Sequence, residues 1–129
     1  MKILLAACNA KYIHSNLAVY DLRAYASAYQ EHILLGEYTI NQTKDEILKD
    51  IYLSGADVVC FSCYIWNISF VRDLLEDLHK ILPDVKFWTG GPEVSFDAEA
   101  FLRRTPQVTG VMVGEGGKTF LEVVRYYVD

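Results

Sequence analysis

The sequence predicts an α/β fold in which a doubly wound, five-stranded parallel sheet has helices on both faces. Short apolar segments of strand length alternate along the chain with segments whose apolar residues recur every three or four positions. The strand segments are apolar throughout, which is typical of parallel strands buried between helices. At 129 residues the chain is long enough for one domain with a single core and leaves no room for a second.

The first strand is expected at Ile3–Cys8, because this continuous apolar run fits a strand that is buried on both faces. A polar loop follows over Asn9–Asn16. Ser15 or Asn16 can cap a helix that is expected to run to about Tyr29. The residues expected on the buried face of this helix are Leu17, Tyr20, Ala24 and Ala28.

The second strand is expected at Ile33–Ile40, although a glycine and a glutamate interrupt its apolar pattern. Thr43 and Glu46 have the spacing of a capping box, which predicts the start of a second helix. Gly55 is expected to end that helix. Its apolar face is expected to consist of Ile47, Leu48, Ile51 and Tyr52.

The third strand is expected at Asp57–Ser62, in the centre of the sheet. The clearest amphipathic helix of the chain follows it and ends at Pro83. The fourth strand, Val85–Thr89, ends at two adjacent glycines, Gly90 and Gly91. The helix between these strands is expected to bury Phe70, Val71, Leu74, Leu75, Leu78 and Leu82.

The last part of the chain is expected to hold a short helix over Phe96–Arg104, with Ser95 as its cap, and a fifth strand over Val108–Val113. The segment Gly114–Gly117 is expected to form the turn into a final helix. The apolar face of the final helix is expected to consist of Phe120, Leu121, Val124 and Val128.

Five strands joined by helices imply the flavodoxin-like strand order 2-1-3-4-5. In such sheets ligands bind beyond the carboxyl ends of the strands, where the strand order reverses. We therefore expect the binding site at this edge of the sheet. The loops that meet there are Asn9–Asn16, Ser62–Asn67, Gly90–Glu93 and Gly114–Gly117.

The composition of the chain limits its partners. The formal net charge of −5 argues against nucleic acid, because phosphate binding requires clustered lysines and arginines. Three cysteines, an odd number, indicate a reducing compartment and no disulfide framework. No segment approaches the roughly 20 apolar residues of a membrane span. We therefore expect a soluble, cytoplasmic protein without a nucleic-acid or membrane partner.

The loops exclude several familiar ligands of this fold class. The segment Asn9–His14 contains no glycine, which argues against dinucleotide binding and against a phosphate-binding P-loop. A phospho-acceptor receiver domain needs an acidic residue after the first strand, an aspartate after the third and a lysine after the fifth, where this chain has Asn9, Ser62 and Gly114. The Ser/Thr-rich phosphate loop of a flavodoxin-type FMN site is also missing.

The segment Gly90-Gly91-Pro92-Glu93 allows two interpretations. Adjacent glycines after a buried strand leave bare backbone that a ligand can approach closely. They are equally suited to a turn in which one glycine adopts a positive φ.

Cysteine and histidine residues at the same edge have structural as well as functional interpretations. Cys60 and Cys63 have the spacing of a redox pair or of half a metal site, but Cys60 lies in an apolar strand and Cys8 could add only a third ligand. Buried thiols are therefore favoured. His14 has no carboxylate or cysteine at metal spacing beside it, so hydrogen bonding is favoured and no metal ligand is assigned.

Aromatic and acidic residues also follow the strands directly. Tyr64 and Trp66 suit either the core or a platform for a large, flat, apolar ligand. Glu93 and Glu115 could act as an acid and base pair, but solvated or capping carboxylates are favoured. The segment Gly114–Gly117 before a helix is a feature of anion sites and also of tight turns.

Four segments occur in a recognisable order: Lys11–Ala18 (KYIHSNLA), Ser62–Asn67 (SCYIWN), Gly90–Val94 (GGPEV) and Val113–Gly116 (VGEG). Together they resemble the amino-terminal cobalamin-binding domain of cobalamin-dependent radical SAM proteins. The similarity covers essentially the whole chain, and it is specific for the combination of segments rather than for any one of them.

The resemblance implies that cobalamin is held at the carboxyl edge of the sheet, with its dimethylbenzimidazole tail in a cleft near Ser62 and the glycine pair. The first loop departs from the Asp-x-His-x-x-Gly motif of the wider family, because Lys11 stands where that motif has its cobalt-ligating histidine. Gly117 also departs from the glutamate that is more common there. The cofactor-binding residues implied by the resemblance are Asn9, Tyr12, His14, Ser62, Tyr64, Trp66, Asn67, Gly90, Gly91, Pro92, Glu93, Gly114, Glu115 and Gly116.

The expected function is that of a cobalamin-binding module of a radical SAM enzyme, methyltransferase-like or related. The resemblance implies that residues 1–129 are one domain excised from a longer chain, whose following radical SAM domain would bind S-adenosylmethionine and a [4Fe-4S] cluster. The module alone would bind without catalysing, and no catalytic residue is assigned. The alternative is a degenerate scaffold or interaction domain that binds nothing, which Lys11 and Gly117 support. A free-standing enzyme that uses Glu93 or Glu115 lacks a recognisable base and nucleophile pair.

Overall fold

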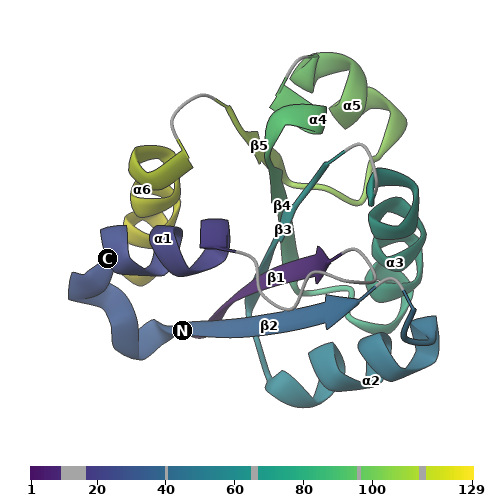
Figure 1. Cartoon of the computed structure of the whole chain (residues 1–129), viewed down its shortest axis with the longest axis horizontal. Helices are drawn as coiled ribbons and strands as arrows, with labels where there is room; N and C mark the ends of the chain where they lie inside the picture. The colour runs from purple at the N-terminus through teal and green to yellow at the C-terminus, as the bar shows by residue number, and fades with distance from the viewer. Residues whose placement is uncertain (10–16, 40, 65–66, 96, 114–115) are drawn as a thin grey trace.

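The computed structural model describes residues 1–9, 17–39, 41–64, 67–95, 97–113 and 116–129. All neighbouring strands of its five-stranded sheet are parallel, in the order β2-β1-β3-β4-β5, and helices cover both faces (Figure 1). The predicted fold class and strand order are confirmed, with β3 in the centre. The strands are β1 (Ile3–Asn9), β2 (Ile33–Thr39), β3 (Val58–Ser62), β4 (Lys86–Gly90) and β5 (Gly110–Met112). The helices are α1 (Leu17–Tyr25), the 3-10 helix η1 (Ser27–His32), α2 (Lys44–Ser54), α3 (Ile68–Ile81), α4 (Pro92–Ser95), α5 (Ala98–Arg104) and α6 (Gly116–Val128).

The strand β1 shows why the sheet has a buried core on each side. All of its residues are buried, and successive side chains point to opposite faces. Leu4 and Ala6 pack with residues of α2, α3 and α5, whereas Leu5 and Ala7 pack in a cluster with residues of α1 and α6. In Figure 1 α1 and α6 lie on one side of the sheet and α2 and α3 on the other.

The first helix is shorter than predicted, and three of the four residues expected on its buried face are exposed, while the side chain of the fourth, Leu17, lies outside the described residues. α1 ends at Tyr25 and η1 follows it, whereas a single helix to Tyr29 was expected. Among the described side chains of this region, Val19 and Ala26 are fully buried and Leu22 is half-buried. The expected face residues Tyr20, Ala24 and Ala28 are exposed. The reason is that alanine has little apolar surface to remove from water, so the larger Val19 and Leu22 determine which face packs on the sheet.

The ends of α2 agree with the prediction, but the buried face of the helix is narrower than predicted. The Thr43 hydroxyl accepts a hydrogen bond from the backbone N–H of Glu46 at 3.2 Å, and Gly55 ends the helix with a φ of 69°. Ile47 and Ile51 are buried, whereas Tyr52 is 56% exposed. Tyr52 follows Ile51 directly, so it lies about 100° further around the helix and away from the sheet.

The segment after β4 differs most from the prediction. Ser95 was expected to cap a helix over 96–104, but it is the last residue of α4. α5 is capped instead by Asp97, whose carboxylate accepts from the backbone N–H of Ala100 at 3.1 Å. Pro92 suits the start of α4, because the first turn of a helix needs no N–H from it.

The boundaries of the elements around the last strand also differ from the predicted ones. Gly90 belongs to β4 rather than to the loop after it, and it pairs with Ser62 and Met112. β5 has three residues, Gly110–Met112, because only these pair with β4. α6 begins at Gly116, inside the segment that was expected to be a turn.

Within the described parts of the chain, no helix combines the length and the apolar composition that a membrane span requires.

Candidate ligand site at the carboxyl edge of the sheet

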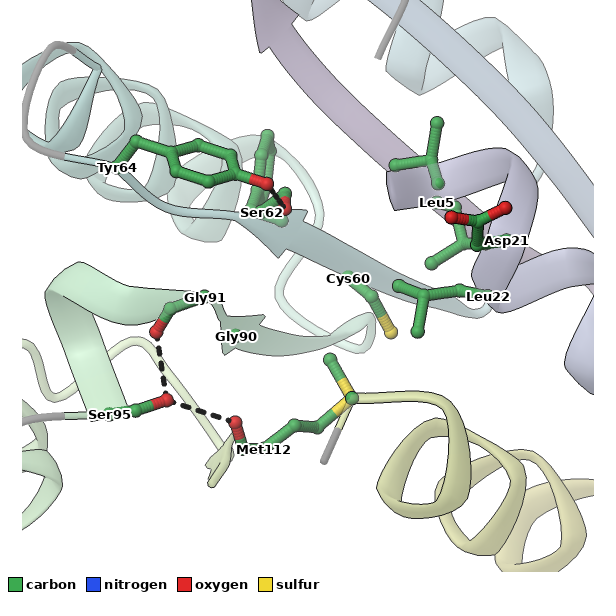
Figure 2. Close-up of a pocket in the computed structure, with 13 residues that line it drawn as sticks. Leu5, Asp21, Leu22, Cys60, Ser62, Tyr64, Gly90, Gly91, Ser95 and Met112 are labelled. Carbon is green, nitrogen blue, oxygen red and sulfur yellow. Dashed lines mark hydrogen bonds between the residues drawn. The ribbon is translucent and has the colours of Figure 1, made fainter. Parts of the chain in front are cut away.

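A cavity of about 520 Å³ opens at the carboxyl ends of the central strands, on the face that α1 and α6 cover (Figure 2). Its volume lies within the roughly 300 to 1,000 Å³ that is typical of small-molecule sites. The lining residues are Leu5, Val19, Asp21, Leu22, Cys60, Phe61, Ser62, Tyr64, Gly90, Gly91, Ser95, Met112 and Gly116.

Small residues in one row across the sheet explain why there is space at this place. Ala7, Ser62 and Gly90 pair with one another across β1, β3 and β4, and the row continues to Met112 on β5. Cys60 lies two positions before Ser62 and therefore on the same face of the sheet. Ala7 and Ser62 have small side chains and Gly90 has none, so this row leaves space between the sheet and the two helices above it.

The two adjacent glycines have different roles. Gly91 has a φ of +103°, and a Cβ atom there would overlap the backbone carbonyl oxygen of Cys63. At Gly90 a Cβ atom would meet only Met112, with the terminal methyl of that flexible side chain 3.3 Å away. The interpretation as a turn with positive φ is therefore confirmed for Gly91, whereas at Gly90 the flexible Met112 side chain would have to give way to an added Cβ atom.

Asn67, which was expected to bind the cofactor, holds the loop after β3 in place. Its side-chain amide donates to the carbonyl oxygens of Cys8, at 3.0 Å, and Ser62, at 3.1 Å. Its side-chain oxygen accepts from the backbone N–H of Tyr64 at 2.7 Å. Because the residue is buried and all three bonds go to backbone, Asn67 fixes the position of Ser62 and Tyr64 in the cavity wall.

The opposite wall is tied together by Ser95 at the end of α4. The Ser95 hydroxyl donates to the carbonyl oxygen of Gly91 at 2.8 Å and lies 3.4 Å from that of Met112 (Figure 2). The backbone N–H of Cys63 donates to the carbonyl oxygen of Gly90 at 2.7 Å. These hydrogen bonds connect the segments after β3 and β4 with β5. They therefore fix the residues at the mouth of the cavity relative to one another.

Among the described residues, the polar side chains that line the cavity are Asp21, Ser62, Tyr64 and Ser95. The Ser62 hydroxyl lies 3.4 Å from the Tyr64 hydroxyl. Asp21 on α1 is exposed. The remaining side chains of the lining are mainly apolar, so the cavity suits a ligand with an extended apolar part.

All three cysteines are buried and free, which confirms the prediction of structural thiols. Burial raises the pKa of Cys8, Cys60 and Cys63 from 9.0 to about 12. Since the thiolate is the form that attacks disulfides, these protonated thiols are poor nucleophiles at physiological pH. The described residues contain no group of three or more side chains that could hold a metal ion.

The residues implied by sequence fall into three groups. Ser62, Tyr64, Gly90, Gly91 and Gly116 line the cavity. Asn9 and Asn67 are buried and Glu93 is exposed, and these three do not belong to the lining. Outside the described residues lie Tyr12, His14, Trp66, Gly114 and Glu115, together with the side chain of Pro92.

Sequence reasoning missed the apolar lining, which comes from α1 and the strand interiors. Strand alternation could have placed Cys60 beside Ser62, because these residues are two positions apart on β3. The contribution of Val19 and Leu22 needed the correct buried face of α1. The lining residues that were not anticipated are Leu5, Val19, Asp21, Leu22, Cys60, Phe61, Ser95 and Met112.

Comparison with known proteins agrees with this geometry. The family model of the B12 binding domain matches residues 3–124. No curated protein sequence is significantly similar to the chain.

Several solved structures share the fold. One is a cobalamin-binding protein from Desulfitobacterium hafniense, with a TM-score of 0.70 and 14% identity over 99% of this chain and 59% of that chain. Another is the cobalamin-dependent S-adenosylmethionine radical enzyme OxsB, with a TM-score of 0.73 and 18% identity over 98% of this chain and 18% of that chain. A CheY-like protein, TadZ from Pseudomonas aeruginosa, has a TM-score of 0.65 and 14% identity over 98% of this chain and 93% of that chain. At these identities the likeness shows a common fold, and this chain spans only part of the length of the first two proteins.

Proposed function

Because this chain belongs to the family of B12-binding domains, we propose that its cavity receives the nucleotide tail of cobalamin, with the corrin ring at the carboxyl edge of the sheet. The observation that carries this proposal is the cavity that Ser62 and Gly90, a pair of small residues on neighbouring strands, line beneath α1 and α6. A tail must pass the sheet edge before it can reach the apolar interior, and Gly90 leaves that path free.

The residues present fit such a ligand. The mouth offers the hydroxyl groups of Ser62, Tyr64 and Ser95, which are suited to the polar ribose and phosphate of the tail. The interior offers apolar side chains, which are suited to its aromatic base. The bound corrinoid supplies cobalt-centred chemistry, and the residues of this chain bind and orient it.

We further propose that residues 1–129 are a module of a longer radical SAM enzyme. The order of the four matching segments supports this, and so does the likeness to OxsB, of whose length this chain covers 18%. In the proposed longer enzyme, a domain that follows residue 129 would bind S-adenosylmethionine and a [4Fe-4S] cluster. That domain would face the corrinoid at the edge of the sheet. The coding sequence beyond residue 129 tests the proposal: a Cys-x-x-x-Cys-x-x-Cys motif is expected there, and a frame that continues without one would contradict it.

Spectroscopy tests the binding itself. When the 129-residue chain is titrated with hydroxocobalamin, we expect a saturable change in the visible spectrum and co-elution of the corrinoid with the protein in gel filtration. A folded chain that neither changes the spectrum nor retains the corrinoid would contradict the proposed function and favour a scaffold that binds no ligand.

A further inference from the structure

The inner end of the cavity differs chemically from its mouth. It is lined by Leu5, Val19 and Leu22 from β1 and α1, and by Cys60 and Met112 from the sheet. In Figure 2 the sulfur atoms of Cys60 and Met112 point toward one another across this end, with Leu22 beside them. Leu5, Val19, Cys60 and Met112 are buried, and Leu22 is half-buried.

Among the residues that the structure describes, few hydrogen-bond acceptors face this inner end. The backbone of β1, β3 and β4 below it is engaged in the sheet, since Leu5 pairs with Cys60 and Cys60 pairs with Trp88. The Cys60 thiol is protonated, because burial raises its pKa to about 12, and sulfur is a weak acceptor. A polar group that enters here therefore loses its hydrogen bonds to water without replacement.

Asp21, the charged residue among the described lining residues, does not compensate for these lost hydrogen bonds. The Asp21 side chain is exposed, so a donor that pairs with its carboxylate only exchanges one hydrogen bond with water for another. By contrast, the inner end is well suited to an arene. Leucine and valine side chains pack on ring faces, and thioether and thiol sulfur atoms make favourable contacts with aromatic rings.

We propose that this inner end selects the corrinoid by its tail base, accepting apolar arenes and discriminating against purines. The inference rests on the proposed function, because it assumes that the tail enters the cavity. Dimethylbenzimidazole carries no N–H donor in the corrinoid, and p-cresol, linked through its oxygen, has no free polar group. Adenine brings an exocyclic amine and additional ring nitrogens, which stay unpaired among these five side chains.

Binding of four corrinoids to the 129-residue chain tests this inference. The probes are cobalamin, the cobamides whose tail bases are p-cresol and adenine, and cobinamide, which has no tail base. We expect the adenine cobamide to bind at least about tenfold more weakly than the p-cresol cobamide, since unpaired polar groups in an apolar site cost about that much or more. p-Cresol cannot ligate cobalt. The affinity of the p-cresol cobamide for the chain therefore reports packing of its tail in the cavity, without the cost of releasing a base from the metal.

A variant separates the cavity from the intrinsic chemistry of the corrinoids. Leu22→Gln places an amide acceptor at the inner end and should reduce the preference for p-cresol over adenine by at least about threefold. The matched control is Leu53→Gln on α2, where Leu53 is 69% exposed and outside the cavity. This control should leave the preference unchanged. Circular dichroism establishes that both variants are folded before the affinities are compared.

The outcomes are distinguishable. If no corrinoid binds, or if cobinamide binds as tightly as the cobamides with tails, the proposed placement of the tail is wrong. If the cobamides bind more tightly than cobinamide but adenine and p-cresol differ by less than about threefold, only the selection of the tail base is overturned. The selection is also overturned if folded Leu22→Gln keeps the full preference of the wild-type chain.

Discussion

Substituting the two adjacent glycines one at a time should give opposite results. Gly91→Ala puts a Cβ atom on a residue with a φ of +103° and against the backbone of Cys63. The strain at such a φ costs about 1 to 3 kcal/mol. Moving Cys63 also weakens the hydrogen bond from its N–H to the carbonyl oxygen of Gly90, which is worth about 1 kcal/mol. The free energy of unfolding should therefore fall by roughly 2 to 4 kcal/mol.

Gly90→Ala should be almost neutral for stability. Gly90 has no positive φ, and its added methyl group would lie closest to the side chain of Met112, 3.3 Å from its terminal methyl group. That side chain is flexible and can move by a few tenths of an ångström. Replacing a strand glycine also reduces the entropy lost on folding, so the change should stay within about 1 kcal/mol.

Urea unfolding followed by circular dichroism measures both changes. With a slope of about 2 kcal/mol per molar urea, Gly91→Ala should lower the midpoint by roughly 1 to 2 M, and Gly90→Ala by less than about 0.5 M. Gly90→Leu, which projects a longer side chain into the cavity, should in addition weaken cobalamin binding by at least about tenfold while the chain stays folded. An unchanged midpoint for Gly91→Ala, or a larger loss for Gly90→Ala than for Gly91→Ala, would refute the reasoning.

Three further predictions concern the surroundings of the cavity. Asn67→Ala removes three hydrogen bonds to backbone and should lower the free energy of unfolding by roughly 2 to 4 kcal/mol; a loss below about 1 kcal/mol would mean that the loop after β3 is held by other contacts. Asp97→Ala should cost about 1 kcal/mol in the same assay as the cap of α5 is lost, and no loss would argue against Asp97 as the cap. The thiols of Cys8, Cys60 and Cys63 should resist Ellman's reagent at pH 8 until the chain is unfolded. The pKa of these thiols rises from 9.0 to about 12 on folding, so the unfolded state loses their protons first as the pH increases. The free energy of unfolding should therefore be highest below pH 9 and should decrease as the pH rises toward 12. An increase in the free energy of unfolding over that range would contradict the burial of these thiols.

The sequence was sufficient to predict the fold because local signals and tertiary packing agree in most elements. The run Ile3–Cys8 is apolar throughout and lies buried on both faces as β1. Thr43 and Gly55 mark the ends of α2 as expected. The strand order places the predicted loops at one edge, and Ser62 and Gly90 from two of them do line one cavity.

Prediction failed where packing between distant segments decides the outcome. Alanine spacing alone could not reveal which face of α1 packs on the sheet, and that face supplies Val19 and Leu22 to the cavity. The boundary between α4 and α5 depends on whether Ser95 or Asp97 caps the second helix, and both residue types are suited to that role. The backbone hydrogen bonds of Asn67 could not be predicted, because a polar residue in a site loop has the same sequence signal whether it binds ligand or backbone.

The most direct test of the central claim uses the two methionines of the chain, Met1 and Met112. Met112 lines the cavity, whereas Met1 precedes β1 at the opposite end of the strands and is 50% exposed. With ¹³C-methyl-labelled methionine, an NMR titration with hydroxocobalamin should shift or broaden the Met112 signal through the aromatic tail while the Met1 signal stays in place. A Met112 signal that stays unchanged at saturating hydroxocobalamin would contradict binding of the tail in this cavity.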